Sequence, residues 1–308
     1  MKIHCTYQKP SSLIATFTIL AIIMLFMRDG RISSEAAEKV KNQFENRFEF
    51  MSRRDVIWTA KGPVTYEEVD NNVFRPNNLK IVEYTYPIPR LDFIQKPSCA
   101  KTFEDWLAIA SKEVPEIPPR EIEEEYKNAF LLNGYTELHP GNYFNAKKRM
   151  GGVVWGNIST LMAASDPVVA YEKEGLAVHH ALRKYPVKNM TGFVIGSQWA
   201  WVEVLALRSG AAEVLTVEYR ETKIVGTERI KYVHPIKFAE QWSEGMGKFD
   251  FAISFSSIEH SGLGRYGDPI DPVGDLREAQ KVLCLLKEGG CRFACPKNDS
   301  AQVKNHYG

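Results

Sequence analysis

The last half of the chain alternates short apolar segments with amphipathic ones, and this pattern limits the possible folds more than any other feature. Strands of four to seven residues are predicted at 192–195, 213–217, 230–233, 249–255 and 290–294. Helices are predicted among them at 166–184, 201–209, 235–242 and 272–286. Strands that are apolar on both faces are typical of sheets covered by helices on both sides. The pattern therefore predicts an α/β fold with a doubly wound, mostly parallel sheet.

Polar residues follow two of these strands, at the sheet edge where such folds bind ligands. Gly196 and Ser197 end one strand before a helix begins, and Glu218 follows the next strand, 22 residues after Gly196. A carboxylate at that place suits the ribose hydroxyls of an adenosine. A dinucleotide needs the pattern G-x-G-x-x-G, but Gly196 stands alone and Trp199, Ala200 and Trp201 fill the neighbouring positions, so S-adenosylmethionine is the favoured cofactor. The alternative is that Gly196 only makes a tight turn and Glu218 is a surface charge.

A third strand end carries groups suited to proton transfer. Ser256 ends the strand with a small side chain that leaves room for a ligand, and we assign it to the cofactor site. Glu259 and His260 follow, where a methyl acceptor would lie. Histidine titrates near neutral pH, so His260 is the candidate base for an acceptor hydroxyl, and Glu259 the candidate to orient its ring or bind substrate hydroxyls. In the alternative reading, His260 only hydrogen-bonds to the backbone.

The loop that follows is rich in glycine and aspartate, at positions 262, 264 and 267 and at positions 268, 271 and 275. The glycines predict a mobile loop that closes over a substrate. The aspartates suit a sugar or a hard cation, and Arg265 suits an anionic group. The alternative for Asp271 and Pro272 is an ordinary helix start. No metal site is assigned.

Three motifs carry a resemblance to a known family. They are G-S-x-x-[PA]-W-x-E at 196–203, T-V-E-Y at 216–219, and S-S-I-E-H-S-G-L-G-R-Y-G-D-P-I-D-P-x-G-D at 256–275. Over about residues 130–308 the chain resembles the nematode-abundant "domain of unknown function 268" family, which is similar in outline to class I S-adenosylmethionine-dependent methyltransferases. The resemblance implies a Rossmann-like, methyltransferase-like sheet. Gln198 departs from the methyltransferase pattern, and the last two strands of such sheets are not found before residue 308.

The amino terminus predicts a membrane segment. Residues 13–27 carry no charge and, with their neighbours, make a marginal span for a signal anchor. The alternatives are a cleaved signal peptide and a buried helix. The predicted order is a tail at 1–11, an anchor at 12–28, a stem helix at 29–60, an irregular and helical region at 61–150, and the α/β domain at 151–308.

Composition bears on the partners and the compartment. The formal net charge is +1, so nucleic acid is not an expected partner. Five cysteines without a C-x-x-C pair exclude a dense disulfide framework but leave one bridge possible. Three N-x-[ST] triplets fit a body in the lumen of the endoplasmic reticulum or Golgi, with secretion after signal cleavage as the alternative.

The sequence thus predicts a membrane-anchored, methyltransferase-like protein of the secretory pathway. The expected reaction is S-adenosylmethionine-dependent O-methylation of a glycan or small hydroxyl acceptor. The alternative is a catalytically inactive Rossmann-like binding or scaffold protein. A glycosyltransferase is less favoured, because no two aspartates have the D-x-D spacing.

Overall fold

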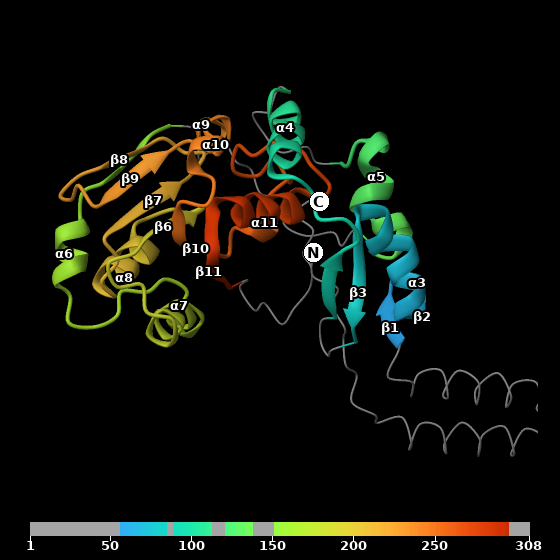
Figure 1. The fold of residues 1–308 in the computed structure, drawn as a ribbon, viewed down its shortest axis with the longest axis horizontal. Helices are drawn as coiled ribbons and strands as arrows, with labels where there is room; N and C mark the ends of the chain where they lie inside the picture. The colour runs from blue at the N-terminus through green and yellow to red at the C-terminus, as the bar shows by residue number, and fades with distance from the viewer. Residues whose placement is uncertain (1–55, 85–88, 113–120, 138–150, 296–308) are drawn as a thin grey trace, which may run out of the picture. The chain divides into compact units, whose positions relative to one another are not determined.

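The computed structural model describes residues 56–84, 89–112, 121–137 and 151–295 (Figure 1). The chain forms two compact units, one of residues 97–130 and 138–308, the other of residues 2–96 and 131–137. The predicted tail, the anchor and most of the stem lie outside the described residues. Within the described ranges, no helix combines the length and the apolar character that a membrane crossing requires.

The smaller unit contains two antiparallel strand pairs. Strands β1 (Val56–Thr59) and β2 (Gly62–Thr65) form one, and β3 (Leu79–Glu83) and β4 (Arg90–Phe93) form the other. Its helical segments are α3 (Tyr66–Val69), a π-helical turn (Asp70–Phe74) and two 3₁₀ turns (Arg75–Asn77 and Leu132–Gly134). The buried Asp70 carboxylate joins these parts, since it pairs with Arg75 at 2.7 Å and accepts the Ile81 amide at 2.7 Å.

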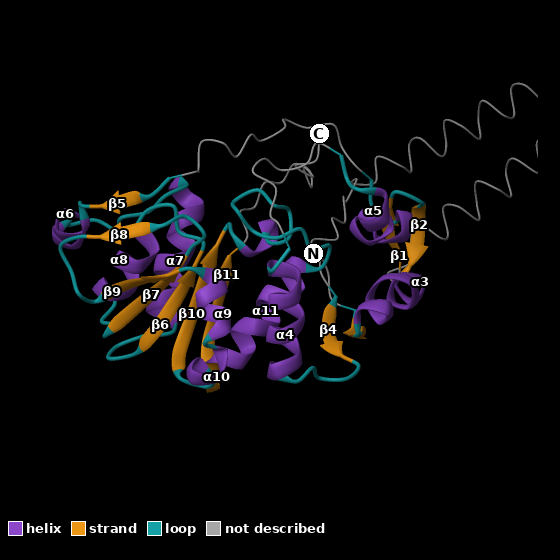
Figure 2. Ribbon diagram, turned by 90° about the horizontal axis from the view of Figure 1, so that it is seen from above, coloured by secondary structure: helices purple, strands orange, loops and turns teal. Residues whose placement is uncertain are grey.

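A five-stranded parallel sheet forms the centre of the larger unit. In space its strands follow the order β11-β10-β6-β7-β9 (Figure 2). Their bounds are β6 (Thr191–Ile195), β7 (Glu213–Val217), β9 (Ile230–Val233), β10 (Phe249–Phe255) and β11 (Leu286–Cys295). The chain proceeds from β6 outward to β7 and β9, then returns to build β10 and β11 on the other side of β6. This confirms the predicted parallel α/β sheet.

Helices cover both faces of this sheet. One face packs against α6 (Ile158–Ala163), α7 (Glu172–Lys184) and α8 (Trp201–Arg208), and the other against α4 (Cys99–Ala110), α9 (Pro235–Glu240) and α11 (Gly274–Leu285). Side chains alternate along β10, where Phe251 and Ile253 join the first core and Ala252 joins the second. The continuous apolar strand pattern follows from this two-sided burial.

The remaining described elements of the larger unit are short. They are α5 (Glu124–Phe130), α10 (Trp242–Gly245), a 3₁₀ turn (Ile258–His260), and the parallel pair β5 (Val153–Trp155) and β8 (Thr222–Ile224). The helix predicted from residue 166 begins only at Glu172. Arg208 binds the carbonyl oxygens of Ala164 and Asp166 at 2.8 Å each and so holds the preceding segment as a loop.

Helix α4 comes from upstream of the predicted start of the α/β domain at residue 151, yet it packs within the larger unit. Its Trp106 ring lies 3.6 Å below the Nζ of Lys281 on α11, in a cation–π contact. A disulfide between Cys99 and Cys284 joins the same two helices, with their Cα atoms 5.6 Å apart. The sequence left one such bridge possible without identifying its cysteines.

We expect the Cys99→Ser/Cys284→Ser double variant to lose roughly 2–5 kcal/mol of unfolding free energy, because the bridge restricts a long loop of the unfolded chain. Urea denaturation of the full chain with and without dithiothreitol measures the loss. Reductant should lower the wild-type midpoint and leave the double variant unchanged. A wild-type midpoint that ignores reductant, with both cysteines reacting as free thiols, would contradict the bridge.

Candidate functional site

A cavity of about 720 Å³, including its open mouth, lies at the carboxyl ends of the strands. Its walls come from the segments that follow β6, β7, β9 and β10. Strands β6 and β10 are neighbours in the sheet, but the chain leads from β6 to α8 on one face and from β10 to α11 on the other. The segments that follow the two strands therefore separate and leave a crevice, as in other doubly wound sheets. The lining residues include Ile195, Gly196, Val217, Glu218, Pro235, Ser256, Ser257, His260, Tyr266 and Asp268.

The structure brings together four of the six residues assigned from the sequence. Gly196, Glu218, Ser256 and His260 all line this cavity. Ser197 lines a second cavity of about 370 Å³, which shares Gln198, Glu218 and Tyr266 with the first. Glu259 lies on the same 3₁₀ turn as His260 but lines neither of these two cavities.

Gly196 has a steric role at the bottom of the crevice. Its φ of +76° is in the left-handed region, and an added Cβ would lie 1.7 Å from the Oγ of Ser257. Its amide donates to the Val217 carbonyl oxygen at 3.0 Å. Gly196 therefore lets the ends of β6, β7 and β10 approach one another.

Ser256 also has a positive φ, of 50°, which is uncommon for a residue with a side chain. Such strain is concentrated at binding and active sites, where the surrounding structure supports it. Here the strained residue lies between the buried end of β10 and Ser257, which packs on Gly196.

Glu218 lies in the wall that the two cavities share. Its residue surface is 9% exposed, and Oε1 accepts the Arg220 amide at 3.1 Å. This short turn after β7 holds the carboxylate beside the crevice.

The predicted mobile loop is instead fastened around one buried carboxylate. Asp268 Oδ2 accepts the amides of Gly262 at 2.9 Å and Gly264 at 3.0 Å, and Oδ1 accepts that of Tyr266 at 2.9 Å. Burial raises the pKa of Asp268, and these backbone hydrogen bonds oppose the rise. The glycines are needed for shape, since a Cβ at Gly262 would lie 2.0 Å from the Asp271 carbonyl oxygen.

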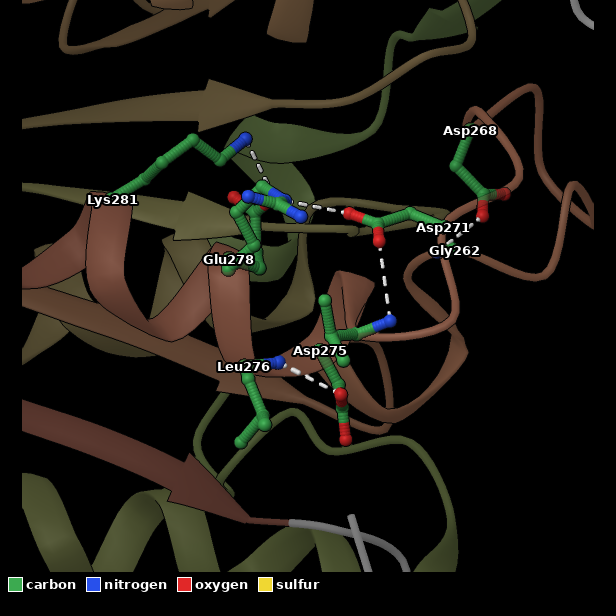
Figure 3. Close-up of polar contacts among 9 residues, drawn as sticks. Gly262, Asp268, Asp271, Asp275, Leu276, Glu278 and Lys281 are labelled. Atoms are coloured by element: carbon green, nitrogen blue, oxygen red, sulfur yellow. Dashed lines mark hydrogen bonds and ion pairs between the residues drawn. The ribbon is translucent and has the colours of Figure 1, made fainter. Parts of the chain in front are cut away.

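The other two aspartates also have partners within the protein (Figure 3). Asp271 pairs with Arg277 at 2.7 Å and accepts the Val273 amide at 3.2 Å, while Asp275 accepts the Leu276 amide at 2.8 Å. Across the described part of the chain, no group of three or more His, Cys, Asp or Glu side chains is placed to hold a metal ion. These contacts give the aspartates structural roles, and their contacts with a sugar or a cation stay a prediction.

The charge of the larger cavity is unbalanced. Three carboxylates contribute to its walls, from Glu218, Asp268 and Glu278, and of these Glu278 pairs with Lys281 at 2.7 Å. No lysine or arginine is among the described lining residues themselves. Arg265, predicted to hold an anionic group, lines neither cavity, and its guanidinium lies over the Tyr266 ring at 5.2 Å. The site therefore disfavours phosphates and favours neutral or cationic ligands.

A polar residue behind the crevice, Glu203, was not assigned to the site from the sequence. Glu203 on α8 is fully buried, and its Oε1 accepts the Thr216 hydroxyl at 2.8 Å. A glutamate inside the apolar run W-V-E-V-L-A-L was the signal that could have identified it.

We expect Asp268→Ala to lower the unfolding free energy by at least about 2 kcal/mol, because three amides, two of them in buried hydrogen bonds, lose their acceptor. Asp275→Ala is the matched control and should cost less than about 1 kcal/mol. Urea denaturation gives both values, and hydrogen exchange should show lost protection at 262–266 only in the first variant. Equal losses in the two variants would contradict the role given to Asp268.

The comparisons with known proteins agree with the motifs. Residues 189–306, which contain all five strands of the parallel sheet and most of the cavity wall, match the family described as "Caenorhabditis protein of unknown function, DUF268". The chain matches no curated protein and no solved structure. The family predicted from the sequence is confirmed over residues 189–306, the part of the chain that matches the DUF268 family model.

Proposed function

We propose that the larger cavity binds S-adenosylmethionine and that the protein methylates a hydroxyl of a small molecule or glycan. The observation that carries the proposal is the position of Glu218 in the same cavity as Gly196 and His260. The sheet order supports it, because numbering the strands along the chain gives 3-2-1-4-5, as in Rossmann-like folds. Such sheets bind adenosine ligands where the order reverses.

The residues present fit this ligand. The Glu218 carboxylate can accept hydrogen bonds from ribose hydroxyls, and Ile195, Val217 and Pro235 give apolar wall for an adenine ring. A nicotinamide dinucleotide fits less well, because its pyrophosphate would face carboxylates without a lysine or arginine in the described wall. The sulfonium of S-adenosylmethionine is cationic and supplies an electrophilic methyl group.

His260 is the residue proposed to act on the acceptor. It lines the cavity beside Tyr266, with their ring centroids 5.6 Å apart. An imidazole nitrogen can take the proton that an acceptor hydroxyl must lose. Glu259 lines neither cavity, so its proposed orienting role has less support than the role of His260.

The disulfide supports a secretory location. Disulfides persist in oxidising compartments and are rare in the cytosol. The bridge Cys99–Cys284 and the exposed sequon asparagines Asn157 and Asn189 are compatible with a luminal body. We therefore propose that residues 12–28 anchor the protein in the endoplasmic reticulum or Golgi membrane, with secretion after cleavage as the alternative.

A second candidate function is ligand binding without catalysis. Gln198 lines both cavities and stands where class I methyltransferases have a second glycine. A side chain there reduces the space beside the Gly196 turn. The two functions differ in methyl transfer and agree in ligand binding.

Titration calorimetry of the full chain in detergent tests the ligand. We expect micromolar affinity for S-adenosylmethionine, weakened at least tenfold in Glu218→Ala because the ribose loses its acceptor. Glu221→Ala, an exposed carboxylate three residues away, is the matched control and should bind as the wild type does. No heat of binding at millimolar S-adenosylmethionine, or an equal loss of affinity in both variants, would contradict the proposal.

Methyl transfer separates the two candidate functions. With radiolabelled S-adenosylmethionine and a panel of methyl glycosides, His260→Asn should transfer label at least a hundredfold more slowly than the wild type. Its affinity for S-adenosylmethionine should change by less than about threefold. Wild-type binding without transfer to any glycoside would favour the binding-protein function for these acceptors.

A further inference from the structure

Glu203 is a carboxyl group in an apolar environment. It lies in the first turn of α8, is 0% exposed, and its helix neighbours Val202 and Val204 belong to the core beneath the sheet. Burying such a group costs free energy that an apolar side chain of similar size would not. A structural or functional gain must offset that cost.

Its contacts join two elements of the crevice. Oε1 accepts the hydroxyl of Thr216, which lies two residues before Glu218 on β7. The hydroxyl of Ser197, buried directly after Gly196, lowers the pKa of the same carboxyl group. Helix α8 directly follows the turn after β6, so the Glu203–Thr216 hydrogen bond joins the chain that leaves this turn to the end of β7.

The second carboxyl oxygen of Glu203, Oε2, makes these contacts sensitive to the ionisation of Glu203. Oε2 has no hydrogen-bond partner among the described residues. Burial raises the pKa of Glu203 to about 7, hydrogen bonds from its own backbone, Thr216 and Ser197 oppose the rise, and the negative Glu218 adds to it. Of the charged side chains in the described residues, Glu218 is the one whose field acts on Glu203. Ionisation would place a second negative charge close to Glu218 in a buried site.

We propose that Glu203 is a positioning residue, which in its neutral form fastens the Gly196–Ser197 turn to the end of β7 and so keeps Glu218 in place for the ligand. The ligand part of this inference rests on the proposed function. The structural part depends only on the three elements that Glu203 joins.

The expected pH dependence follows from linkage. The native pKa of about 7 lies above the ordinary value of 4.5, so the native state holds the proton more tightly than the unfolded chain. The resulting stabilisation is complete below pH 4.5 and is lost as the pH rises to about 7. Above that pH, the ionised Glu203 should loosen the turn.

Two substitutions separate the effect of the Glu203 charge from the effect of its hydrogen bond with Thr216. Glu203→Gln keeps the shape and the Thr216 contact but cannot ionise, and Glu203→Leu fills the space without any hydrogen bond. Glu228→Gln removes an exposed carboxylate and is the matched control. The measurement is hydrogen exchange of the peptides 195–200 and 215–220 at pH 6 and 8, corrected for intrinsic rates and without ligand.

In the wild type and in Glu228→Gln, protection of both peptides should fall at least fivefold between pH 6 and 8. In Glu203→Gln it should stay constant, which is rescue by the conservative variant, and in Glu203→Leu it should be low at both values. A wild-type fall that persists in Glu203→Gln would overturn the proposal, as would full protection in Glu203→Leu. If Glu203→Leu does not fold, the comparison with Glu203→Gln still decides.

Affinity for S-adenosylmethionine gives the second measurement. We expect Glu203→Gln to bind within about threefold of the wild type at pH 6 and more tightly than it at pH 8, and Glu203→Leu to bind at least tenfold more weakly at pH 6. If the wild type does not bind S-adenosylmethionine, the proposed function fails. The exchange data still decide the role of Glu203.

Discussion

The close approach of β6 and β10 is the constraint on which the rest of the structure depends. These strands pair in parallel in space, although β7 and β9 come between them along the sequence. Gly196 has no side chain, and this leaves room for the Ser257 side chain where the two strands end. Without that glycine, the strand ends would have to separate, and the cavity wall would change with them. The crevice therefore results from the sheet order, and Glu218 and His260 reach it because they follow β7 and β10.

Around this crevice, three buried carboxyl groups each stabilise a different part of the structure. Asp268 accepts hydrogen bonds from three amides of a glycine-rich loop, Asp271 holds the start of α11 through Arg277, and Glu203 connects α8 to β7. Each of the three side chains accepts hydrogen bonds from its partners: loop amides for Asp268, the Arg277 guanidinium and the Val273 amide for Asp271, and the Thr216 hydroxyl for Glu203. The loop after β10 is thus ordered by its polar residues, and its glycines supply the backbone conformations that this order requires.

Much of the sheet could be predicted from the sequence, because a strand that is buried on both faces consists of consecutive apolar residues. The predicted bounds of β7, β9 and β10 agree with the structure residue for residue. Four of the assigned site residues share a cavity for a related reason, since the carboxyl ends of parallel strands meet at one edge. Residues next to strand ends are therefore the ones that sequence reasoning places well.

The remaining features depend on contacts between distant segments, which a local pattern does not encode. Nothing near Cys99 indicates Cys284 as its partner, and nothing near Asp268 shows that its oxygens accept three amides. The pairing of β5 with β8 was missed because each strand has only three residues.

The bond between α4 and α11 also affects how the protein is made. Cys99 and Cys284 are separated by 185 positions, and the whole parallel sheet except β11 is encoded between them. During synthesis, the thiol of Cys99 stays without its partner until residue 284 has left the ribosome. The bond between α4 and α11 can therefore form only after the other helices of that face have been made, and a chain that stops before Cys284 leaves Cys99 unpaired and the sheet without β11.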